Sequence, residues 1–427
     1  MDYVFQNIIY YAKIIIIIIC VFVILFSIYY LIYLVYGFKK EETLKKANKN
    51  TKFAVIIPAR NESNVISGIL NCLKNQTYSK DDFDVYVVIE SKDDPSFNIV
   101  KKHGFNVVVR GDIENRKTKG FAIEDCLNYL KNNNTYNTYD SFIIFDADNL
   151  MNNNFIEKLN DLRIDKNVQV GSGYRDFRNA SVNYISINSA MQLFLANGIV
   201  SKARSSFFKK VMINGTGYFI DREIIDKAGG WIFNGLTEDV QVSTYCLYHN
   251  VKMGYYDEAI YYDEEPTSHK IMHKQHIRWV WGFIASRKRF KKKDLDFGAN
   301  KKFIKNLAIF DFNFFLIPII IFIVLTLLTF LFLFITFIVS LFIASDFSLM
   351  LFLYSLIPLG ILYFVGVIST FIVLILNRKK FKFSFKKNLL CGFTYILWVF
   401  DFVFSFFEGL FSKKKRSTWT IIPHKGK

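Results

Sequence analysis

The chain has 427 residues, of which 52% are apolar and 18% aromatic, and its formal net charge is +17. The apolar share exceeds the roughly 45–50% of an ordinary soluble domain, so the sequence predicts a membrane protein. The charge alone would suggest a nucleic-acid partner, but no basic stripe interleaved with stacking aromatics runs through the polar segment, so none is expected.

Residues 1–36 are predicted to form an N-terminal transmembrane helix. Ile14 to Tyr36 is nearly uncharged, and at about 1.5 Å per residue it spans a hydrocarbon core of about 30 Å. No small-residue cleavage site follows, which indicates a retained anchor. Lysines crowd the basic linker of residues 37–51, whereas Lys13 stands nearly alone before the span, so the N-terminus is expected outside.

Residues 52–290 are predicted to form one cytosolic domain with a mostly parallel α/β sheet. Short Val/Ile runs alternate with helical patterns, which is typical of a parallel sheet covered on both faces. Ligands of such sheets bind at the carboxyl ends of the strands. Strands are expected at 53–57, 85–89, 107–109 and 142–145, and helices at 63–75, near Asn98 and at 120–131.

Asp146 and Asp148 follow the last of these predicted strands. Two carboxylates two residues apart at a strand end can face a metal and a nucleotide together. Mg²⁺ or Mn²⁺ takes one or two protein carboxylates plus diphosphate oxygens. Asp148 is therefore the predicted metal ligand, with Asp146 toward ribose or metal. A solvated turn is the alternative, because Asp-x-Asp is common by chance.

Asp239 lies in a glycine-rich stretch that suits a loop near a ligand. It is the predicted catalytic base, and Glu238 beside it would raise an acid's pKa by like-charge repulsion. The alternative is a helix N-terminus with Thr237 as N-cap and acids in the first turn. Both interpretations can hold together, because such a cap would fix the base in place.

The stretch from Thr267 to Phe290 is predicted to be a helix along the cytosolic face of the bilayer. Arg278 can fork onto phosphate oxygens, Gln275 faces the same way one turn earlier, and Trp279 offers a flat surface for a sugar ring. An interfacial helix that anchors its Arg and Trp side chains in the membrane is the alternative.

Cysteine and histidine do not predict a zinc site or a disulfide framework. The five cysteines lack Cys-x-x-Cys spacing, and lysines neighbour the three histidines of the last helix. These residues are Cys20, Cys72, Cys126, Cys246 and Cys391, and His269, His273 and His276.

The remainder of the chain is predicted to be mainly membrane-embedded. A crossing at 389–411 would place a basic cluster outside, and Asp401 and Glu408 make a poor lipid-facing span. An interfacial or re-entrant segment is therefore favoured over a third C-terminal crossing. The predicted parts are a basic, interfacial connection (291–316), two transmembrane helices (317–376), a basic cytosolic loop (377–388), the segment 389–411 and a cytosolic tail (412–427).

Taken together, the polar domain resembles the membrane-embedded, inverting glycosyltransferases of family 2, which include cellulose, chitin and hyaluronan synthases and ceramide glucosyltransferase. Tyr262-Asp-Glu-Glu-Pro-Thr267 looks like the bacterial and archaeal polysaccharide-synthase branch. The resemblance covers about residues 53–290 and rests on Pro58-Ala-Arg-Asn-Glu62, Lys119-Gly120, Asp146-Ala-Asp-Asn149, Asn214-Gly-Thr-Gly217, Thr237-Glu-Asp239 and Gln275-His-Ile-Arg-Trp279.

The resemblance implies a Rossmann-like GT-A fold, a UDP-sugar donor and Mg²⁺ or Mn²⁺ as cofactor. Asp148 would bind the metal, and Asp239 would deprotonate the acceptor with Glu238 beside it. Glu90 stands where the family usually has an Asp that reads uridine. The implied nucleotide-sugar contacts are Pro58, Arg60, Glu62, Glu90, Lys119 and Asp146, and the implied acceptor and diphosphate contacts are Gln275, Arg278, Trp279, Gly215 and Thr216.

The leading functional expectation is a processive or semi-processive enzyme of the cell membrane that builds a β-linked polysaccharide and could also export it. Its partners would be a UDP-sugar, a polysaccharide or lipid-linked acceptor and the bilayer; accessory subunits and the identity of the sugar are not predicted. Transfer of a single sugar to a membrane lipid is the alternative within the same chemistry. An inactive nucleotide-sugar-binding subunit is the alternative outside it.

Overall fold

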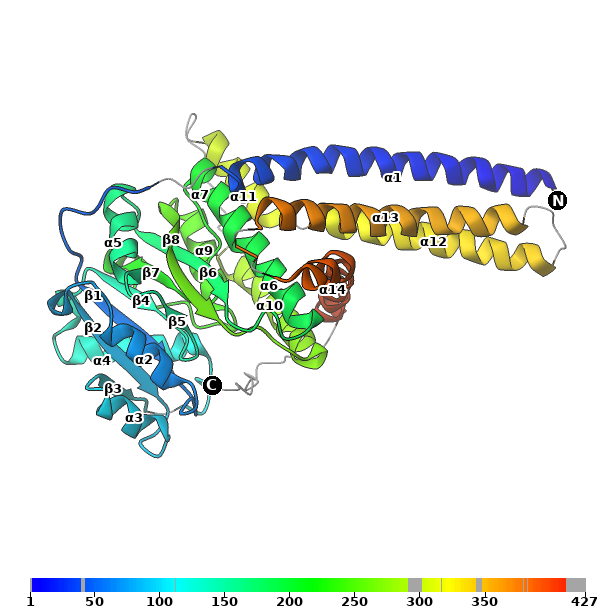
Figure 1. The fold of residues 1–427 in the computed structure, drawn as a ribbon. Helices are drawn as coiled ribbons and strands as arrows, with labels where there is room; N and C mark the ends of the chain where they lie inside the picture. The colour runs from blue at the N-terminus through cyan, green and yellow to red at the C-terminus, as the bar shows by residue number, and fades with distance from the viewer. Residues whose placement is uncertain are drawn as a thin grey trace. The chain divides into compact units, whose positions relative to one another are not determined.

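The computed structural model describes residues 2–39, 43–111, 113–290, 302–315, 317–342, 348–378, 380–381 and 383–411. The chain divides into two compact units (Figure 1). One unit, Met1–Phe38 with Phe310–Val403, holds long apolar helices. The other, Lys39–Ile309 with Phe404–Lys427, holds the α/β fold.

The α/β unit is built on an eight-stranded sheet in the order β3-β2-β1-β4-β7-β6-β8-β5. Strands β3, β2, β1 and β4 are parallel, β7 is antiparallel to both of its neighbours, β6 and β8 are parallel, and β5 reverses beside β8. The strands are β1 (Phe53–Pro58), β2 (Phe83–Ile89), β3 (Asn106–Val109), β4 (Ser141–Ile144), β5 (Leu150–Met151), β6 (Val170–Phe177), β7 (Tyr218–Asp221) and β8 (Met253–Asp263).

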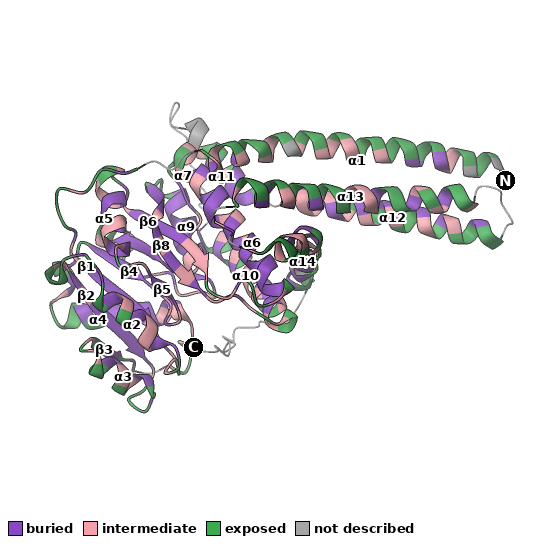
Figure 2. Ribbon diagram, in the orientation of Figure 1, coloured by how far each residue is buried: buried purple, intermediate pink, exposed green. Residues whose placement is uncertain are grey.

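The central strands are buried on both faces, as Figure 2 shows in purple. Val55 and Ile57 of β1 join a core cluster with α2, whereas Ala54 and Ile56 alternate to the opposite face, because successive strand side chains point to opposite sides. The predicted strands and helices of this half are confirmed with small shifts at their ends. The helices are α2 (Ile66–Lys74), α3 (Ser96–Lys102), α4 (Lys119–Asn132) and α5 (Phe155–Asp165), with 3₁₀ turns η1 (Lys80–Asp82) and η2 (Tyr136–Thr138).

Between β6 and β7 the chain forms a helix with a π-helical centre. Asn183 caps its start: its side chain accepts from the amides of Ile185 and Ser186, and the Ser186 hydroxyl accepts from the Asn183 amide. Long π-helical stretches are rare. The elements are α6 (Tyr184–Leu193), η3 (Phe194–Ser201, the π-helix) and α7 (Lys202–Phe208), followed later by α8 (Arg222–Lys227), α9 (Glu238–Tyr248) and α10 (His269–Phe290).

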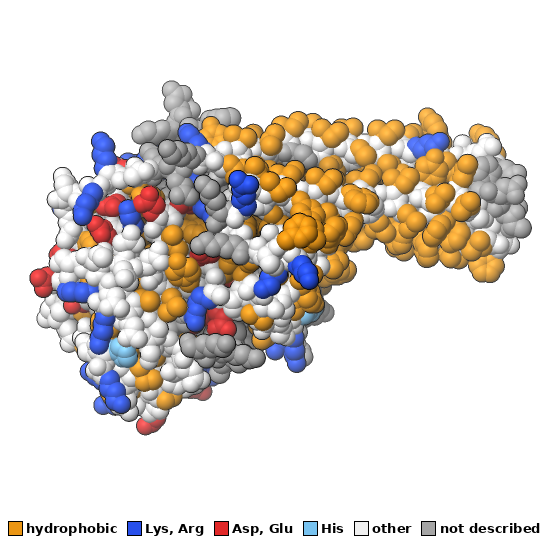
Figure 3. Space-filling view, viewed as in Figure 1, with side chains coloured by type: hydrophobic (Ala, Val, Ile, Leu, Met, Phe, Trp, Pro, Cys, Tyr) orange, Lys and Arg blue, Asp and Glu red, His pale blue; other side chains and the backbone are white. Residues whose placement is uncertain are grey.

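Four helices are long and apolar enough to cross a membrane, judged by length and composition among the described residues; they cover Gln6–Gly37, Lys305–Phe342, Ser348–Leu376 and Phe385–Gly409. Orange apolar side chains cover the visible faces of the helical unit in Figure 3. The elements in these four segments are α1 (Asp2–Gly37), then α11 (Lys302–Phe314) and α12 (Ile317–Phe342), which share the second segment, then α13 (Ser348–Leu376) and α14 (Phe385–Phe411). The predicted segment 389–411 therefore lies in one unbroken helix, and its interfacial, re-entrant or crossing placement stays a prediction.

Small polar residues line the buried stripe of α12 beside α13. The Thr326, Thr329 and Thr336 hydroxyls each donate at 2.8 Å to the carbonyl four residues earlier. These bonds satisfy hydroxyls that have no access to water, and small side chains let membrane helices approach closely. The stripe explains how α12 and α13 pack without a run of charged residues.

The predicted connection at 291–316 contains a helix. Residues 291–301 lie outside the described part, and α11 follows. Asp311 of α11 is buried and accepts a 2.5 Å hydrogen bond from the Tyr29 hydroxyl of α1, and a second from Tyr33. Two phenol donors thus satisfy the carboxylate and join α11 to the end of α1.

Candidate active site

The predicted site residues gather at the carboxyl edge of the parallel strands. Pro58 ends β1, Glu90 follows β2 and Asp146 follows β4, and these three strands are neighbours. Lys119 begins α4, the helix that leads from β3 to β4. The placement agrees with the rule that open α/β sheets bind ligands at this edge.

Lys119 joins three of the sequence motifs. Its Nζ lies 2.6 Å from Asp146 Oδ1 and 3.2 Å from Glu238 Oε1, and it donates to the Gly215 carbonyl at 2.7 Å. Burial opposes the charge of Lys119, but attraction to Asp146 and Glu238 outweighs it and raises the lysine pKa above its ordinary value. Lys119 is therefore a firmly protonated cation among these acids.

Close packing against a neighbouring loop explains why glycine follows Lys119. A Cβ at position 120 would lie 2.2 Å from the Phe233 carbonyl oxygen. The Thr118 hydroxyl, which caps α4, also donates to the Asn234 carbonyl at 2.9 Å. The loop before α9 thus packs directly on the start of α4, and only glycine allows that approach.

Asp239 lies in the first turn of α9, and its Oδ2 accepts a 2.6 Å hydrogen bond from the Gly215 amide. Burial raises the pKa of Asp239, against main-chain hydrogen bonds, Lys119 and Arg278, which lower it. Burial also raises the pKa of Glu238, against Lys119. Both pKa values are raised, in the expected direction, but the first cause is burial and not the expected like-charge repulsion. Thr237 stands at the N-cap as the alternative interpretation expected, but its side chain makes no capping hydrogen bond.

The Gly215–Gly217 loop is held from both sides. Gly215 and Gly217 have φ values of +86° and +68°, a region that favours glycine. The buried Thr216 hydroxyl donates to Asn149 Oδ1 at 2.6 Å and accepts from the Asp146 amide at 2.9 Å. Protein groups therefore supply both its acceptor and its donor. The Tyr261 hydroxyl donates to the Thr216 carbonyl at 3.0 Å.

The donor set at Asp146 and Asp148 fits a hard divalent cation. The Asp146 side chain is 38% exposed, and the Asp148 carbonyl accepts from Arg178 Nη1 at 3.0 Å. Among the described residues no three His, Cys, Asp or Glu side chains gather around one point. Mg²⁺ and Mn²⁺ require only one or two protein carboxylates when a diphosphate and water supply the other ligands, so these carboxylates suffice.

Glu90 stands between two arginines. Arg60 Nε lies 3.0 Å from Glu90 Oε2, and Arg110 Nη1 lies 3.9 Å from Glu90 Oε1. Glu62 lies in the loop between β1 and α2, and its main-chain carbonyl accepts from the Val65 and Ile66 amides. Glu90 is thus fixed at the end of β2, near the residues expected to bind the nucleotide.

Arg278 is the member of the α10 motif that reaches the acids. Its Nη1 donates to the Leu236 carbonyl at 3.3 Å, and its charge lowers the pKa of Asp239. The Trp279 ring lies 5.5 Å from the buried His276 ring. Gln275 is half-buried on α10, one turn before Trp279.

Comparison with known proteins assigns the α/β unit to a family. The family model described as "Glycosyltransferase like family 2" matches residues 50–282, more than half of the chain. The chain belongs to this family. A family-2 relative from Bacillus subtilis (strain 168), named "Probable glycosyltransferase YdaM", is 28% identical over 285 residues, which are 62% of this chain and 63% of the relative.

Two solved structures also resemble the chain. The mannosyltransferase PcManGT from Pyrobaculum calidifontis, in complex with GDP-Man and Mn²⁺, is 14% identical, covers 93% of this chain and 99% of its own, and has a TM-score of 0.49. S. aureus TarS 1–349 in complex with UDP is 16% identical, covers 62% of this chain and 72% of its own, and has a TM-score of 0.40.

The family-2 assignment and the strand order identify the α/β unit as a GT-A fold, a Rossmann-like, mostly parallel sheet with helical segments. The predicted fold class is therefore confirmed. The antiparallel β7 sits in the middle of the sheet, between β4 and β6, and carries the end of the Gly215–Gly217 loop.

Several charged residues close to the candidate site were not predicted. Arg175 of β6 pairs with Asp263 at the end of β8, and Glu265 is buried nearby. Burial raises the pKa of Glu265 to about 7, against attraction by Arg175 and with repulsion by Asp148. The acidic run after β8 was visible in the sequence, but no local pattern links it to an arginine on β6.

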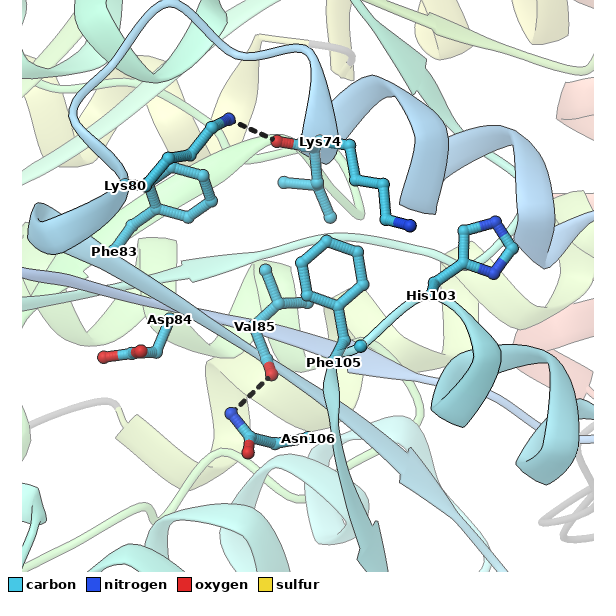
Figure 4. Close-up of a pocket in the computed structure, with 10 residues that line it drawn as sticks. Lys74, Lys80, Phe83, Asp84, Val85, His103, Phe105 and Asn106 are labelled. Atoms are coloured by element: carbon cyan, nitrogen blue, oxygen red, sulfur yellow. Dashed lines mark hydrogen bonds between the residues drawn. The ribbon is translucent and has the colours of Figure 1, made fainter.

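A pocket of about 280 Å³ lies at the other edge of the sheet, by the amino ends of β2 and β3 (Figure 4). The Nζ of Lys80, which lines the pocket, donates a hydrogen bond to the Leu73 carbonyl at 3.1 Å. The pocket does not include any of the acids described above, so it is separate from the candidate site. Its lining residues are Leu73, Lys74, Lys80, Phe83, Asp84, Val85, His103, Gly104, Phe105 and Asn106.

Proposed function

We propose that the chain is a membrane-bound, inverting glycosyltransferase that moves a sugar from a UDP-sugar to a growing β-linked polysaccharide. The observation that carries the proposal is the contact of Lys119 with Asp146, Glu238 and the Gly215 carbonyl, beside Asp239. These contacts bring a donor-binding acid, a cation and a candidate base to one place. Family membership supports the same chemistry.

In the proposed reaction Asp239 accepts the proton of the acceptor hydroxyl. The hydroxyl oxygen forms the new bond to the anomeric carbon, while the bond from that carbon to the phosphate oxygen breaks and UDP leaves with the electron pair. A single in-line displacement converts an α-linked donor into a β-linked product. The raised pKa of Asp239 suits a base, since proton transfer is most efficient when the pKa approaches the working pH.

Charged groups around Asp239 would bind the diphosphate. The charges of Lys119 and Arg278 both act on Asp239 and lower its pKa, and a divalent cation held by Asp148 would neutralise charge on the leaving group. Asp146 would contact the nucleotide or share the metal. Pro58, Arg60, Glu62 and Glu90 are proposed to bind the nucleotide, and Gln275, Trp279, Gly215 and Thr216 to line the acceptor and diphosphate side.

Transfer of one sugar to a membrane lipid is the second candidate function. It is favoured by the four candidate spans in the described part of the chain, because four helices make a narrow bundle for a polymer channel. Both candidates place the enzyme in the cell membrane, with the catalytic unit in the cytosol and the N-terminus outside.

The test is transfer by purified protein from a panel of radiolabelled UDP- and GDP-sugars with Mg²⁺ or Mn²⁺, with products sized on a gel. A ladder of products supports polymerisation, and a single lipid-soluble product supports the second candidate. Absence of transfer from every donor would refute both.

Asp239→Asn is expected to lower the rate of transfer at least about 100-fold, because it removes the base. UDP binding, measured by calorimetry, should be largely kept, because Asp239 acts on the acceptor. Unchanged turnover by this variant would exclude Asp239 as the base.

A further inference from the structure

A closed set of hydrogen bonds surrounds the loop that precedes β7. Arg175 Nη1 donates to the Asn214 carbonyl at 3.2 Å, and Arg175 Nη2 pairs with Asp263 Oδ2. Asn149 Nδ2 donates to Asp263 Oδ1 at 2.9 Å, and the Thr216 hydroxyl donates to Asn149 Oδ1 at 2.6 Å. We name Asn149, Arg175 and Asp263 the loop clamp, because together they hold residues 214–216.

The clamped loop touches both sides of the proposed reaction. The Gly215 amide donates to the Asp239 carboxylate at 2.6 Å, and the Thr216 hydroxyl accepts from the Asp146 amide at 2.9 Å. The same short peptide therefore sets the position of the proposed base and of the acid that faces the donor. A shift of the loop would move one relative to the other.

Two members of the loop clamp, Asn149 and Asp263, are buried, and the Asn149 side chain both donates and accepts hydrogen bonds. Asn149 is 0% exposed and Asp263 6% exposed. Asn149 accepts through its oxygen and donates through its nitrogen, a combination that an aspartate cannot supply when ionised. Satisfied polar networks in low-dielectric surroundings rigidify a site, and a lost member leaves its partner without a bond.

We infer that Asn149 and Asp263 are positioning residues that align the base with the donor-binding acid. The inference rests on the proposed function and deepens it. Neither side chain has to touch substrate. Asn149 bonds to the Thr216 hydroxyl, accepts from the Asp146 amide at 3.3 Å and donates to Asp148 Oδ1 at 3.5 Å, whereas Asp263 acts through Asn149 and Arg175. Arg175 completes the clamp by fixing Asp263 and the Asn214 carbonyl.

The test compares Asn149→Ala and Asp263→Asn with the wild-type enzyme in detergent, using the donor that wild type transfers. Each variant is expected to lower kcat about 100-fold, the cost of a displacement of about 1 Å in a site. UDP affinity should change less than about threefold, because the donor contacts are kept. The double variant should be no slower than the slower single variant, because both changes break one unit.

Asn160→Ala is the matched control. Asn160 of α5 is also buried, accepts from the Thr51 hydroxyl at 2.7 Å and donates to the Lys49 carbonyl at 3.0 Å. It should lower Tm about as much as Asn149→Ala while kcat stays at the wild-type value.

The outcomes separate the two proposals. A wild-type enzyme without transfer refutes the proposed function itself. If the wild type is active, two results overturn the positioning role. One is a variant with a lower Tm but the wild-type kcat. The other is a variant in which UDP binding is lost together with transfer. If Asn149→Ala does not fold, the isosteric Asp263→Asn decides: wild-type kcat in that variant overturns the inference.

Discussion

Lys119 shows how one side chain can organise a site. Its ammonium group bonds to two carboxylates and a main-chain carbonyl, each from a different motif. A lysine has three rotatable donors on a compact charge, whereas the planar fork of arginine suits paired oxygens of one group. Three separate acceptors around one nitrogen therefore explain lysine at this position. The local Lys119-Gly120 pattern predicted a ligand contact, but it could not show that the lysine also binds the motif residues to one another.

Glu265 is expected to make the free energy of unfolding depend on pH. Its pKa rises from 4.5 to about 7 in the folded protein, so the folded state binds the proton more tightly than the unfolded state. Stability contributed by the proton is present below pH 4.5 and lost as the pH rises through 7. In metal-free buffer Glu265→Gln should therefore stabilise the protein by up to about 3 kcal/mol at pH 8 and by little at pH 5.

Thermal unfolding at the two pH values, in the presence of a chelator, measures this difference. Glu258→Gln is the control of opposite sign, because the hydrogen bond from Lys158 lowers the pKa of Glu258. A Glu265→Gln variant that unfolds at the wild-type temperature at pH 8 would show that Glu265 is not a destabilising buried acid.

At the scale of elements, the contact of α9 with α10 brings Asp239, the proposed base, under the influence of Arg278. A Cβ on Gly282 of α10 would lie 2.1 Å from Thr237 Oγ1, at the start of α9. Gly282→Ala should therefore push the helices apart, cost about 1–3 kcal/mol of stability and lower kcat about 10- to 100-fold. Thermal unfolding and transfer rates with the active donor check both effects.

Gly360→Ala provides the matched control for that substitution. Gly360 also lies within a helix, α13, and a Cβ there would meet nothing within 4 Å. It should leave stability and rate at the wild-type values. Equal effects of the two substitutions would mean that the loss does not come from the α9–α10 contact.

The first half of the sheet could be predicted from the sequence, and the second half could not. Strands β1 to β4 are apolar runs separated by helices, and that local pattern predicts that they are parallel. By contrast, β6 carries Arg175 and Asp176 and pairs with β8, far along the chain. The loop clamp arises from those long-range pairings, which explains why Arg175 and Asp263 escaped prediction although Asp146 and Asp239 did not.

At the scale of the whole molecule, the end of α14 packs within the α/β unit, and this packing leads to a test of the predicted topology. Within the α/β unit, Glu408 Oε2 lies 3.0 Å from His273 Nε2 of α10, and the Ser405 hydroxyl lies 3.0 Å from His273 Nδ1. These contacts hold residues 404–411 against α10 in the α/β unit. They also provide a partner for Glu408, which is unsuited to contact lipid.

A tag appended after residue 427 is therefore expected on the same side of the membrane as the catalytic unit. Protease protection in sealed vesicles of both orientations, with a second tag before residue 1, measures the two ends. The N-terminal tag should be protected wherever the C-terminal tag is cleaved. Cleavage of both tags on one side would contradict the predicted orientation.

The Gly215 amide, which holds Asp239, has one more consequence. Because the donor is main chain, a new side chain at position 215 other than proline keeps this donor, provided that the backbone conformation is unchanged. A Cβ at position 215 would meet nothing within 4 Å, so the obstacle to other residues is the positive φ rather than space. Asparagine tolerates such angles better than most residues. Asparagine at position 215 would therefore add a side chain beside the proposed base, and this substitution is a way to alter the proposed specificity for the acceptor.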